Sequence, residues 1–464
     1  MSPAEPTAPA RTASAPAGEG ARPLPAGYRS VPLSAERYRE VLDLDMWAFP
    51  SSVEVDEAHK SPSPLTWSRT FGVVADHEDD RAVPVDGALP VTTELAAMHA
   101  SYPFSRFPVP GGTLPVAGLT WVGVHPQHRR KGLLTAMIDE HLARCRELGE
   151  PVSALFAAEA AIYGRFGYGQ AANDLRLTIP RGAALRDVPG ADAHTVRIEK
   201  ADRERHGELV AALHVAAGTG AHVATADGCP VNRPGWATRE TPELQAAFWS
   251  DPVAFRGGRE SRRIVVVERD GEPRGYATFR RKTTWEQTGP RGTVSTGEVV
   301  ALDAAAARAL WGVLTDLDLT SEVEPFVLPV DDVVTHLLVD PRAAAPRVAD
   351  NVWVRVVDVP AALAGRRYAA DVDVVLHVTD ARVAQNAGHW RVRAEGFGPA
   401  RSERTDDAAD LSLDVRELGS AYLGGVSLTS LAAAGLVTEH RPGALAHAAA
   451  AFSWPVAPVC SWVF

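Results

Sequence analysis

Three cations and a glycine stand together at residues 129–132 (RRKG), just before a helical pattern. Apolar residues between 133 and 145 recur at the spacing of one helix face, and the pattern stops near Gly149. Free backbone amides and the positive end of the helix dipole favour an anion at such an N-terminus, and glycine lets the backbone approach it closely. The sequence therefore predicts a diphosphate site. A solvated basic turn that only caps the helix is the alternative, because short basic runs usually lie on the surface.

The segments on either side of this loop are predicted to be strands. Residues 122–124 (VGV) are β-formers around a glycine, and Pro126 ends the run because proline has no amide to donate. Residues 151–157 (PVSALFA) are typical of a buried strand, and a turn with the sequence YGRFGY follows from Tyr163. A tyrosine has an unperturbed pKa of about 10, so Tyr163 is a candidate proton donor at neutral pH. The alternative is a packed ring whose hydroxyl bonds the backbone.

These motifs resemble the acetyl-CoA site of the GNAT N-acetyltransferase superfamily, in which a strand, a basic glycine loop, a helix, a second strand and a tyrosine turn follow one another. The segments HRRKGLLTAM (128–137), AAIYGRFGYG (160–169) and NVWVRVVDVPAAL (351–363), and the terminal Phe464, are similar to one branch, the Eis family of three-domain acetyltransferases. The resemblance covers roughly residues 28–464. One departure from the superfamily is Leu134, where most members have a small residue; Eis-type proteins resemble this chain in having GLL there.

The resemblance implies an acetyl-CoA-dependent N-acetyltransferase that acts on primary amines such as aminoglycosides, lysine side chains or polyamines. The main chain of the VGV strand would bind the pantetheine arm as an added strand does, and the loop with the first helical turn would bind the diphosphate. Two residues after the second strand match positions that line the cofactor in the family. The predicted acetyl-CoA contacts are Val122, Gly123, Val124, Arg129, Arg130, Lys131, Gly132, Leu133, Leu134, Thr135, Ala158 and Glu159.

Acetyl transfer from a thioester to an amine needs a proton donor for the leaving thiolate and an amine that is neutral when it attacks. The resemblance implies Tyr163 as general acid and the C-terminal carboxylate, here that of Phe464, as general base. The apolar tail PVAPVCSWVF indicates that this chain end is buried. Plain packing of the tail is an alternative, and so is Glu159 as the base. Val463 stands where an acidic residue would suit a polycationic acceptor, which argues against a preference for aminoglycosides.

Trp47 and Trp121 are the predicted acceptor contacts. Trp47 belongs to a helical pattern before Pro50, and in the superfamily this helical edge forms a wall of the acceptor pocket. Trp121 directly precedes the cofactor strand, although packing in the core is an equal alternative for it. His125 and His128 lie three residues apart in a loop of cations that would repel a metal ion, so we expect no metal site.

Length and composition are compatible with this interpretation. A chain of 464 residues is too long for one ordinary domain. Its 58 acidic residues against 47 Lys and Arg give a net charge of −11, which argues against nucleic acid as a partner. The three cysteines, Cys145, Cys229 and Cys460, have no paired spacing and indicate a reducing cytoplasm. No apolar run is long enough to span a membrane, and we expect residues 1–26, rich in Ala and Pro, to be a flexible tail.

We predict an α+β fold with tandem GNAT domains, the first active and the second degenerate, followed by a sterol-carrier-like domain that carries the catalytic C-terminus. The expected bounds are 27–185, 186–345 and 346–464. The resemblance also implies a homo-hexamer. Two other functions are compatible with the residues: a coenzyme A-binding sensor or scaffold without turnover, and a lipid carrier that uses the C-terminal domain.

The degenerate domain is inferred from an internal repeat. The segment EVVALDAAAARALWGVL (298–314) can be aligned without gaps on the cofactor motif so that Val300 to Leu302 match Val122 to Val124. In this register Leu310 falls at Gly132, and Ala307 and Ala309 replace Arg129 and Lys131. The second copy would therefore keep the strand-to-helix shape and lose the phosphate site. An unrelated α/β domain with a chance overlap is the alternative.

Overall fold

The first half of the chain is organised around a seven-stranded sheet with the order β1-β2-β3-β4-β5-β18-β6. The computed structural model describes residues 22–78, 91–220, 223–226, 228 and 230–464, so most of the predicted tail at residues 1–26 lies outside the described residues. Neighbouring strands are antiparallel except β4 and β5. The strands are β1 (Tyr28–Pro32), β2 (Thr70–Glu78), β3 (Val91–Val109), β4 (Gly112–Val124), β5 (Val152–Phe156), β18 (Val352–Val356) and β6 (Gly169–Gln170). The helices are η1 (Ala35–Arg37), α1 (Tyr38–Ala48), α2 (Val55–Ala58), η2 (Trp67–Arg69), η3 (Pro126–His128), α3 (Leu133–Glu147), α4 (Ala160–Tyr163) and η4 (Gly164–Phe166).

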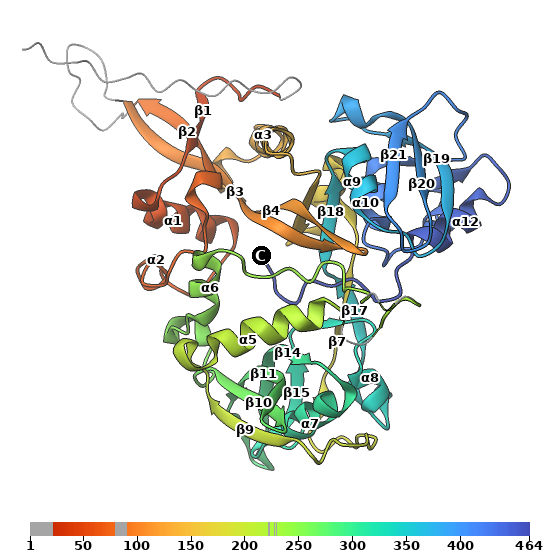
Figure 1. The fold of residues 1–464 in the computed structure, drawn as a ribbon. Helices are drawn as coiled ribbons and strands as arrows, with labels where there is room; N and C mark the ends of the chain where they lie inside the picture. Colours follow the sequence, from red (N-terminus) through yellow and green to blue (C-terminus); the bar gives the residue numbers. More distant parts are fainter. Residues whose placement is uncertain (1–21, 79–90, 221–222, 227, 229) are drawn as a thin grey trace, which may run out of the picture.

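A second, six-stranded sheet repeats this plan below the first one in Figure 1, with the order β8-β15-β14-β11-β10-β9 and one parallel pair, β14 with β15. Its strands are β8 (Ile179–Pro180), β9 (Thr195–Lys200), β10 (Arg263–Arg269), β11 (Glu272–Lys282), β14 (Gly292–Ala301) and β15 (Thr320–Pro325). The hairpin β12 (Trp285–Glu286) and β13 (Gly289–Pro290) extends from it, and a small sheet joins β16 (Leu328–Pro329), β7 (Asn173–Arg176) and β17 (Arg347–Asp350). The helices of this part are α5 (Arg203–Gly218), α6 (Pro242–Trp249), η5 (Val253–Arg256), α7 (Ala304–Leu314), α8 (Val334–Leu337) and η6 (Pro341–Ala344).

The C-terminal part forms a five-stranded sheet with the order β21-β20-β19-β22-β23, covered by short helices. Its strands are β19 (Val372–Thr379), β20 (Gly388–Ala394), β21 (Ala400–Arg404), β22 (Leu411–Asp414) and β23 (Val437–Glu439). The helices are α9 (Val359–Gly365), η7 (Ala384–Asn386), α10 (Val415–Ala421), α11 (Leu428–Ala433) and α12 (Ala444–Phe452). One apolar core runs from this sheet into the first one through β18, so the two parts are packed together.

Two strands cross between the parts. β18 lies in the range predicted for the third domain, yet it pairs with β5 and β6 of the first sheet. β8 lies in the range predicted for the first domain, yet it pairs with β15 of the second sheet. The predicted bounds remain predictions, but cutting the chain at them would remove a strand from a sheet and expose its unpaired amides.

The gapless alignment of the internal repeat is wrong. In the first sheet eight residues separate the end of β4 from the start of α3, whereas only two separate the end of β14 from the start of α7. Leu310 therefore lies inside α7, fully buried, and does not correspond to Gly132. Asp303 takes the capping position of α7 and accepts a hydrogen bond from the Ala306 amide at 2.8 Å. The second half has lost the whole loop, and a carboxylate occupies its helix N-terminus.

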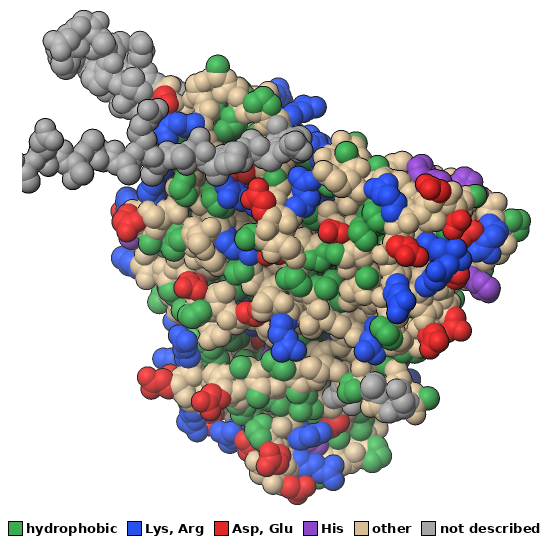
Figure 2. All heavy atoms as spheres, turned by 45° about the horizontal axis from the view of Figure 1, so that its top comes forward, with side chains coloured by type: hydrophobic (Ala, Val, Ile, Leu, Met, Phe, Trp, Pro, Cys, Tyr) green, Lys and Arg blue, Asp and Glu red, His purple; other side chains and the backbone are tan. Residues whose placement is uncertain are grey.

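On the face shown in Figure 2, Lys and Arg side chains lie among Asp and Glu side chains. Surface ion pairs such as that of Arg391 with Asp373, at 2.7 Å, belong to this mixed pattern. None of the helices in the described part of the chain combines the length and the apolar character needed to cross a membrane.

A buried ion pair connects the C-terminal part to the tyrosine turn. Arg355 in β18 and Asp380 are both almost fully buried, and their side chains lie 2.7 Å apart. Arg355 also donates a hydrogen bond to the carbonyl oxygen of Phe166 at 2.9 Å, three residues after Tyr163 in the same turn. A side chain at Gly167 would come within 2.7 Å of Arg355, so glycine is needed for this close approach. The guanidinium thereby fixes the position of the turn.

We expect Asp380→Ala to destabilise the fold by about 3–5 kcal/mol, because it leaves a buried guanidinium unpaired. The matched control is Asp373→Ala, which removes a half-exposed partner of Arg391 and should cost less than about 1 kcal/mol. Urea denaturation followed by tryptophan fluorescence measures both. Equal midpoints for the two variants would contradict a structural role for the buried pair.

Candidate active site

β4 and β5 pair over only three residues and then separate. Their parallel pairing runs from Val116 to Gly118 on β4, and from Leu119 onward β4 has no strand on that side. On its other side β4 stays paired with β3 as far as Val124, through a bulge at Trp121, where φ is 51°. The edge of residues 119–124 facing β5 is therefore open, and an extended ligand can add to it as a strand would. The predicted strand contacts Val122, Gly123 and Val124 lie on this edge.

The basic loop lies where this edge leads into α3. Arg129, Arg130 and Lys131 are exposed, and Arg129 and Arg130 form no ion pair with a described residue. Gly132 takes the capping position of α3 at φ 85°, a left-handed conformation that glycine adopts without strain. No side chain caps the helix, so the amides of Leu133, Leu134 and Thr135 in its first turn have no intrahelical acceptor. The loop thus presents cations and free amides together, as diphosphate binding requires.

Tyr163 lies at the end of α4, behind the point where β4 and β5 separate. It is 8% exposed, its ring packs edge-on against Tyr168 at 5.9 Å, and its hydroxyl has no hydrogen-bond partner among the described residues. Burial, helped by the nearby charge of Glu159, raises the pKa of Tyr163 to about 12. The phenol therefore stays protonated at neutral pH with its proton free to donate. Ala158 and Glu159 are exposed on the loop between β5 and α4.

The last residues of the chain run to the centre of the molecule, where the three parts meet (Figure 1). The Val459 amide donates to the Pro234 carbonyl oxygen at 3.0 Å. The Cys460 amide donates to the Asn351 side chain at 2.8 Å, and the same side chain donates back to the Cys460 carbonyl oxygen at 3.2 Å. Since Asn351 directly precedes β18, this pair of bonds ties the tail to the start of a strand inside the first sheet.

The second half of the chain holds the next two tail residues. The Ser461 hydroxyl shares a hydrogen bond with His214 of α5 at 2.8 Å, and the Trp462 indole donates to the Ala237 carbonyl oxygen at 2.8 Å. The guanidinium of Arg239 lies 4.8 Å from the centre of the Trp462 ring. These contacts leave the tail little freedom, so the second half of the chain and Asn351 together fix the position of residues 459–462.

The Phe464 ring lies where β4 and β5 part. It packs edge-on against four aromatic rings at centroid distances of 5.0 to 6.4 Å, those of Tyr102, Phe104, Phe156 and Trp462. Gly118, the last paired residue of β4, makes room for this cluster, because a Cβ there would fall 2.4 Å from Phe104 and 3.1 Å from Phe464. The terminal residue is therefore seated beside the open edge of β4.

A cavity of about 830 Å³ opens between the first sheet, the second sheet and the tail. Tyr102, Thr120 and Trp121 line it from the first sheet, and Trp121 donates a hydrogen bond to the Tyr102 hydroxyl at 3.3 Å. Residues 461–464 line it from the tail. Trp47 is 56% exposed, packs against His125 and does not line this cavity. The structure thus brings Trp121 and Phe464 together and leaves Trp47 apart from them.

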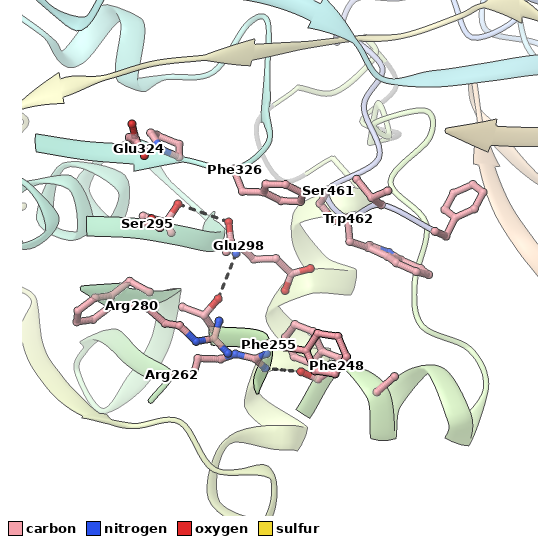
Figure 3. A pocket seen from close by; sticks show the side chains of 18 of the residues that line it. Phe248, Phe255, Arg262, Arg280, Ser295, Glu298, Glu324, Phe326, Ser461 and Trp462 are labelled. Carbon is pink, nitrogen blue, oxygen red and sulfur yellow. Dashed lines mark hydrogen bonds between the residues drawn. The ribbon is translucent and has the colours of Figure 1, made fainter. Parts of the chain in front are cut away.

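The opposite wall comes from the second half of the chain and was missed by sequence reasoning. Figure 3 shows Arg262 and Arg280 close to each other on this wall, with Phe248 and Phe255 beside them and Ser461 and Trp462 of the tail across from them. The only available signal was the arginine-rich stretch RGGRESRR at residues 256–263, which has no motif that assigns it a role.

The structure also gathers three groups that have the spacing of metal ligands. Glu94, His125 and His128 each place one ligand atom within 4.8 Å of the others. Burial lowers the pKa of His128, and the charge of Lys131 acts in the same direction, against the attraction of Glu94. A cation bound here would meet the same repulsion from Lys131, so the geometry alone does not assign a metal to this cluster.

Comparison with known proteins matches this architecture. Two segments, residues 30–171 and 235–356, match families described as "Acetyltransferase (GNAT) domain", and residues 359–461 match "Sterol carrier protein domain". An uncharacterized N-acetyltransferase of Streptomyces avermitilis is 42% identical, over 85% of this chain and 94% of that protein. N-acetyltransferase Eis of Mycobacterium bovis is 35% identical, over 76% of this chain and 83% of that protein. The crystal structure of Eis1 from Mycobacterium abscessus has a TM-score of 0.72 at 30% identity and covers 94% of this chain and 100% of that chain.

The fold and these relatives define an N-acetyltransferase with tandem GNAT domains and a C-terminal sterol-carrier-like domain. The predicted α+β fold class is confirmed. Within this class the chain belongs to the Eis family.

We expect Gly118→Ala to displace the chain end, because the added Cβ would collide with the rings of Phe104 and Phe464. Overpacking of this kind costs about 1–3 kcal/mol. The tail should then become more accessible to carboxypeptidase, which digestion followed by mass spectrometry detects. The control is Gly112→Ala on the same strand, where a Cβ would meet only the Gly365 carbonyl oxygen at 3.4 Å. Equal digestion of both variants would show that Gly118 does not seat the tail.

Proposed function

We propose that this protein transfers the acetyl group of acetyl-CoA to a primary amine, with Tyr163 as general acid and the Phe464 carboxylate as general base. One observation carries the proposal: the open edge of β4 connects an exposed cationic loop at a helix N-terminus with a buried phenol and the seated chain end. A thioester that binds along this edge would have its diphosphate at one end and its carbonyl group near Tyr163 and Phe464.

The donor site in this proposal consists of main-chain groups and cations. Amides and carbonyl groups of residues 122–124 would bond the pantetheine arm, and the amides of residues 133–135 would bond the diphosphate. Arg129, Arg130 and Lys131 add charge-assisted contacts, which are about twice as strong as neutral ones. Ala158 and Glu159 would flank the far side of the arm, after β5. The cations of the loop, Ala158 and Glu159 are exposed, whereas Gly123 and Leu133 are buried and would contribute main-chain groups only.

Tyr163 donates its proton toward the sulfur as the C–S bond breaks. A phenol with a pKa of about 12 is fully protonated at neutral pH, so every enzyme molecule can supply this hydrogen bond. The same burial that raises the pKa excludes water, which strengthens a hydrogen bond to a developing anion. The Phe464 carboxylate accepts the proton of the attacking nitrogen as the C–N bond forms. That nitrogen becomes much more acidic once it is bonded to carbon, so a carboxylate is a sufficient base.

The acceptor would enter through the 830 Å³ cavity, where Trp121 forms part of the wall. Trp47 does not line this cavity, so we do not include it among the proposed acceptor contacts. The family resemblance supports a homo-hexamer, and the three cysteines without paired spacing support a cytoplasmic enzyme. We include both in the proposal.

Replacing Tyr163 by Phe tests the acid. We expect kcat to fall about 10²–10⁴-fold, because general acid catalysis contributes that much, while acetyl-CoA affinity changes little. Thiol release from acetyl-CoA with a panel of primary amines measures kcat, and calorimetry measures acetyl-CoA binding.

The matched control is Tyr168→Phe, which removes a hydroxyl bonded to Ser153 in the core at 2.8 Å and should lower stability more than turnover. Wild-type kcat in the Tyr163→Phe variant would reject the assignment. Tight acetyl-CoA binding by the wild-type protein without thiol release for any amine would support a coenzyme A-binding scaffold instead.

Extending the chain beyond Phe464 tests the base. Two added residues, Gly-Ser, move the carboxylate by several ångströms, so we expect kcat to fall at least tenfold with unchanged acetyl-CoA affinity. The same two residues added at the N-terminus serve as the control. Full turnover by the C-terminally extended protein would mean that another group, such as Glu159, accepts the proton.

A further inference from the structure

The cavity that receives the acceptor in the proposed function is strongly basic. Seven arginines line it, against only two glutamates, and no lysine or aspartate belongs to the lining. Asp174 and Asp251, just behind the lining, pair with three of the arginines. When these two aspartates and the terminal carboxylate are counted, cations still outnumber anions in and around the cavity. The family resemblance had implied cationic acceptors for this site.

The positive charge is concentrated on the wall that faces the tail. We call Arg256, Arg259, Arg262 and Arg280 the arginine cluster. Asp251 is the carboxylate that the cluster shares: it lies 3.1 Å from Arg256 and 2.6 Å from Arg280. Burial opposes its ionisation, but hydrogen bonds from Arg280 and from a main-chain amide prevail and lower the pKa of Asp251. Asp251 therefore pairs with only two of the four guanidinium groups.

Two members of the cluster have no carboxylate partner among the described residues. Arg262 donates to the main-chain oxygens of Phe248 and Ser250. Arg259 donates to the Ser295 hydroxyl at 3.2 Å and to the Arg256 carbonyl oxygen. An ion-pair network built only for stability would give each buried guanidinium an acid, because an unpaired buried charge is costly. Here the main chain orients the guanidinium groups without neutralising them.

One donor of the cluster is left without a partner among the described residues. The Nε of Arg280 is buried and has no hydrogen-bond partner in the described structure. Burial lowers the pKa of Arg262 to about 10, and repulsion from Arg280 adds to this effect. Both facts indicate that the carboxylates of the protein do not balance the positive charge here, and that its acceptors do not bond every donor.

Apolar rings border the cluster. Phe248, Phe255 and Phe326 line the cavity with Trp462 of the tail (Figure 3). Arg262 lies 5.3 Å from the Phe248 ring centre, which helps to hold its guanidinium in place. The route from Trp121 and Phe464 to the cluster is therefore a hydrophobic passage with cations at its far wall.

We propose that the acceptor is an amine that carries an anionic group, a carboxylate or a phosphate, at the end opposite to its amine, and that the arginine cluster binds this group. The inference rests on the proposed function and specifies its acceptor class. A carboxylate or phosphate accepts paired hydrogen bonds from guanidinium groups. A polycation in this cavity would be repelled by the same groups, so the anionic end is the feature that selects the acceptor.

Matched acceptors that differ only in one substituent test the proposal. The neutral reference is benzylamine, the anionic arms are 4-(aminomethyl)benzoate and 4-(aminomethyl)phenylphosphonate, and the cationic arm is 1,4-bis(aminomethyl)benzene. Hydrogen bonds to charged groups contribute about 1.5–3 kcal/mol, so kcat/KM for an anionic arm should exceed that for benzylamine about ten- to hundredfold. The cationic arm should be the poorest. The difference between the two anionic arms tells which anion the cluster prefers.

Substitutions of single arginines test whether the arginine cluster causes the preference for anionic acceptors. Arg262→Gln should reduce the ratio of kcat/KM between the preferred anionic arm and benzylamine at least tenfold, mainly through KM, and Arg262→Lys should retain part of it. Arg262 bonds two main-chain oxygens and Arg259 only one, so Arg259→Gln provides a second variant with less risk to folding. The matched control is Arg401→Gln, at an exposed arginine of β21, which should keep the wild-type ratio. Binding of 4-methylbenzoate and phenylphosphonate, which lack the amine, gives a readout independent of turnover.

The outcomes separate this inference from the proposed function. Thiol release with benzylamine but no preference for either anionic arm, or a preference for the cationic arm, would overturn the inference and leave acetyl transfer intact. An anionic preference that survives in both Arg262→Gln and Arg259→Gln would also overturn it. No thiol release with any arm, despite acetyl-CoA binding, would reject the proposed function, and amine-less anions that still bind would then show that the cluster is an anion site by itself.

Discussion

The separation of β4 from β5 beyond Gly118 is the constraint on which the site depends. Three paired residues hold the two strands together, and after them one strand edge carries amides and carbonyl groups without a strand partner. An unpaired edge inside a protein is costly unless a ligand or another segment satisfies it. Here the gap receives the aromatic ring of the last residue, which packs against Phe156 at the end of β5 and against Phe104. The ring of the last residue thus packs at the point where the two strands separate.

The position of the chain end in turn depends on a hydrogen bond between two uncharged side chains, one of which belongs to the second half of the chain. Burial lowers the pKa of His214 to about 4, so the imidazole is uncharged at neutral pH and its hydrogen bond to Ser461 is one between neutral groups. Glu298 lies 3.6 Å from His214 but keeps its charge, because Arg239 pairs with it at 2.9 Å and Tyr276 donates to it at 2.8 Å. The second GNAT domain has lost its phosphate loop, and its interior now positions the tail.

Local patterns predicted the parts of this structure that depend on neighbours in sequence. The strand, basic loop and α3 were predictable because helix periodicity and the glycine at 132 act within a few residues, and α3 spans Leu133–Glu147 as that pattern indicates. The gapless repeat failed because a loop deletion leaves no trace in the composition of the flanking elements. The arginine cluster was not predictable. Arg256 ends η5, Arg259 and Arg262 lie in the loop before β10, and Arg280 belongs to β11, so only tertiary packing brings them opposite a tail more than 180 residues away.

The two ends of the cavity have opposite charge. The basic wall can therefore orient an acceptor as well as increase its affinity. In the proposed function a carboxylate stands at the end near Trp121, and the arginine cluster stands at the other. An acceptor with an ammonium and an anionic group would align with this field in one orientation only, with its nitrogen toward the base. The carboxylate beside the nitrogen favours the ammonium form, so the distribution of charge explains the orientation of the acceptor and not its deprotonation. The proton would leave after the nitrogen has bonded to carbon, when even a weak base at the chain end is enough.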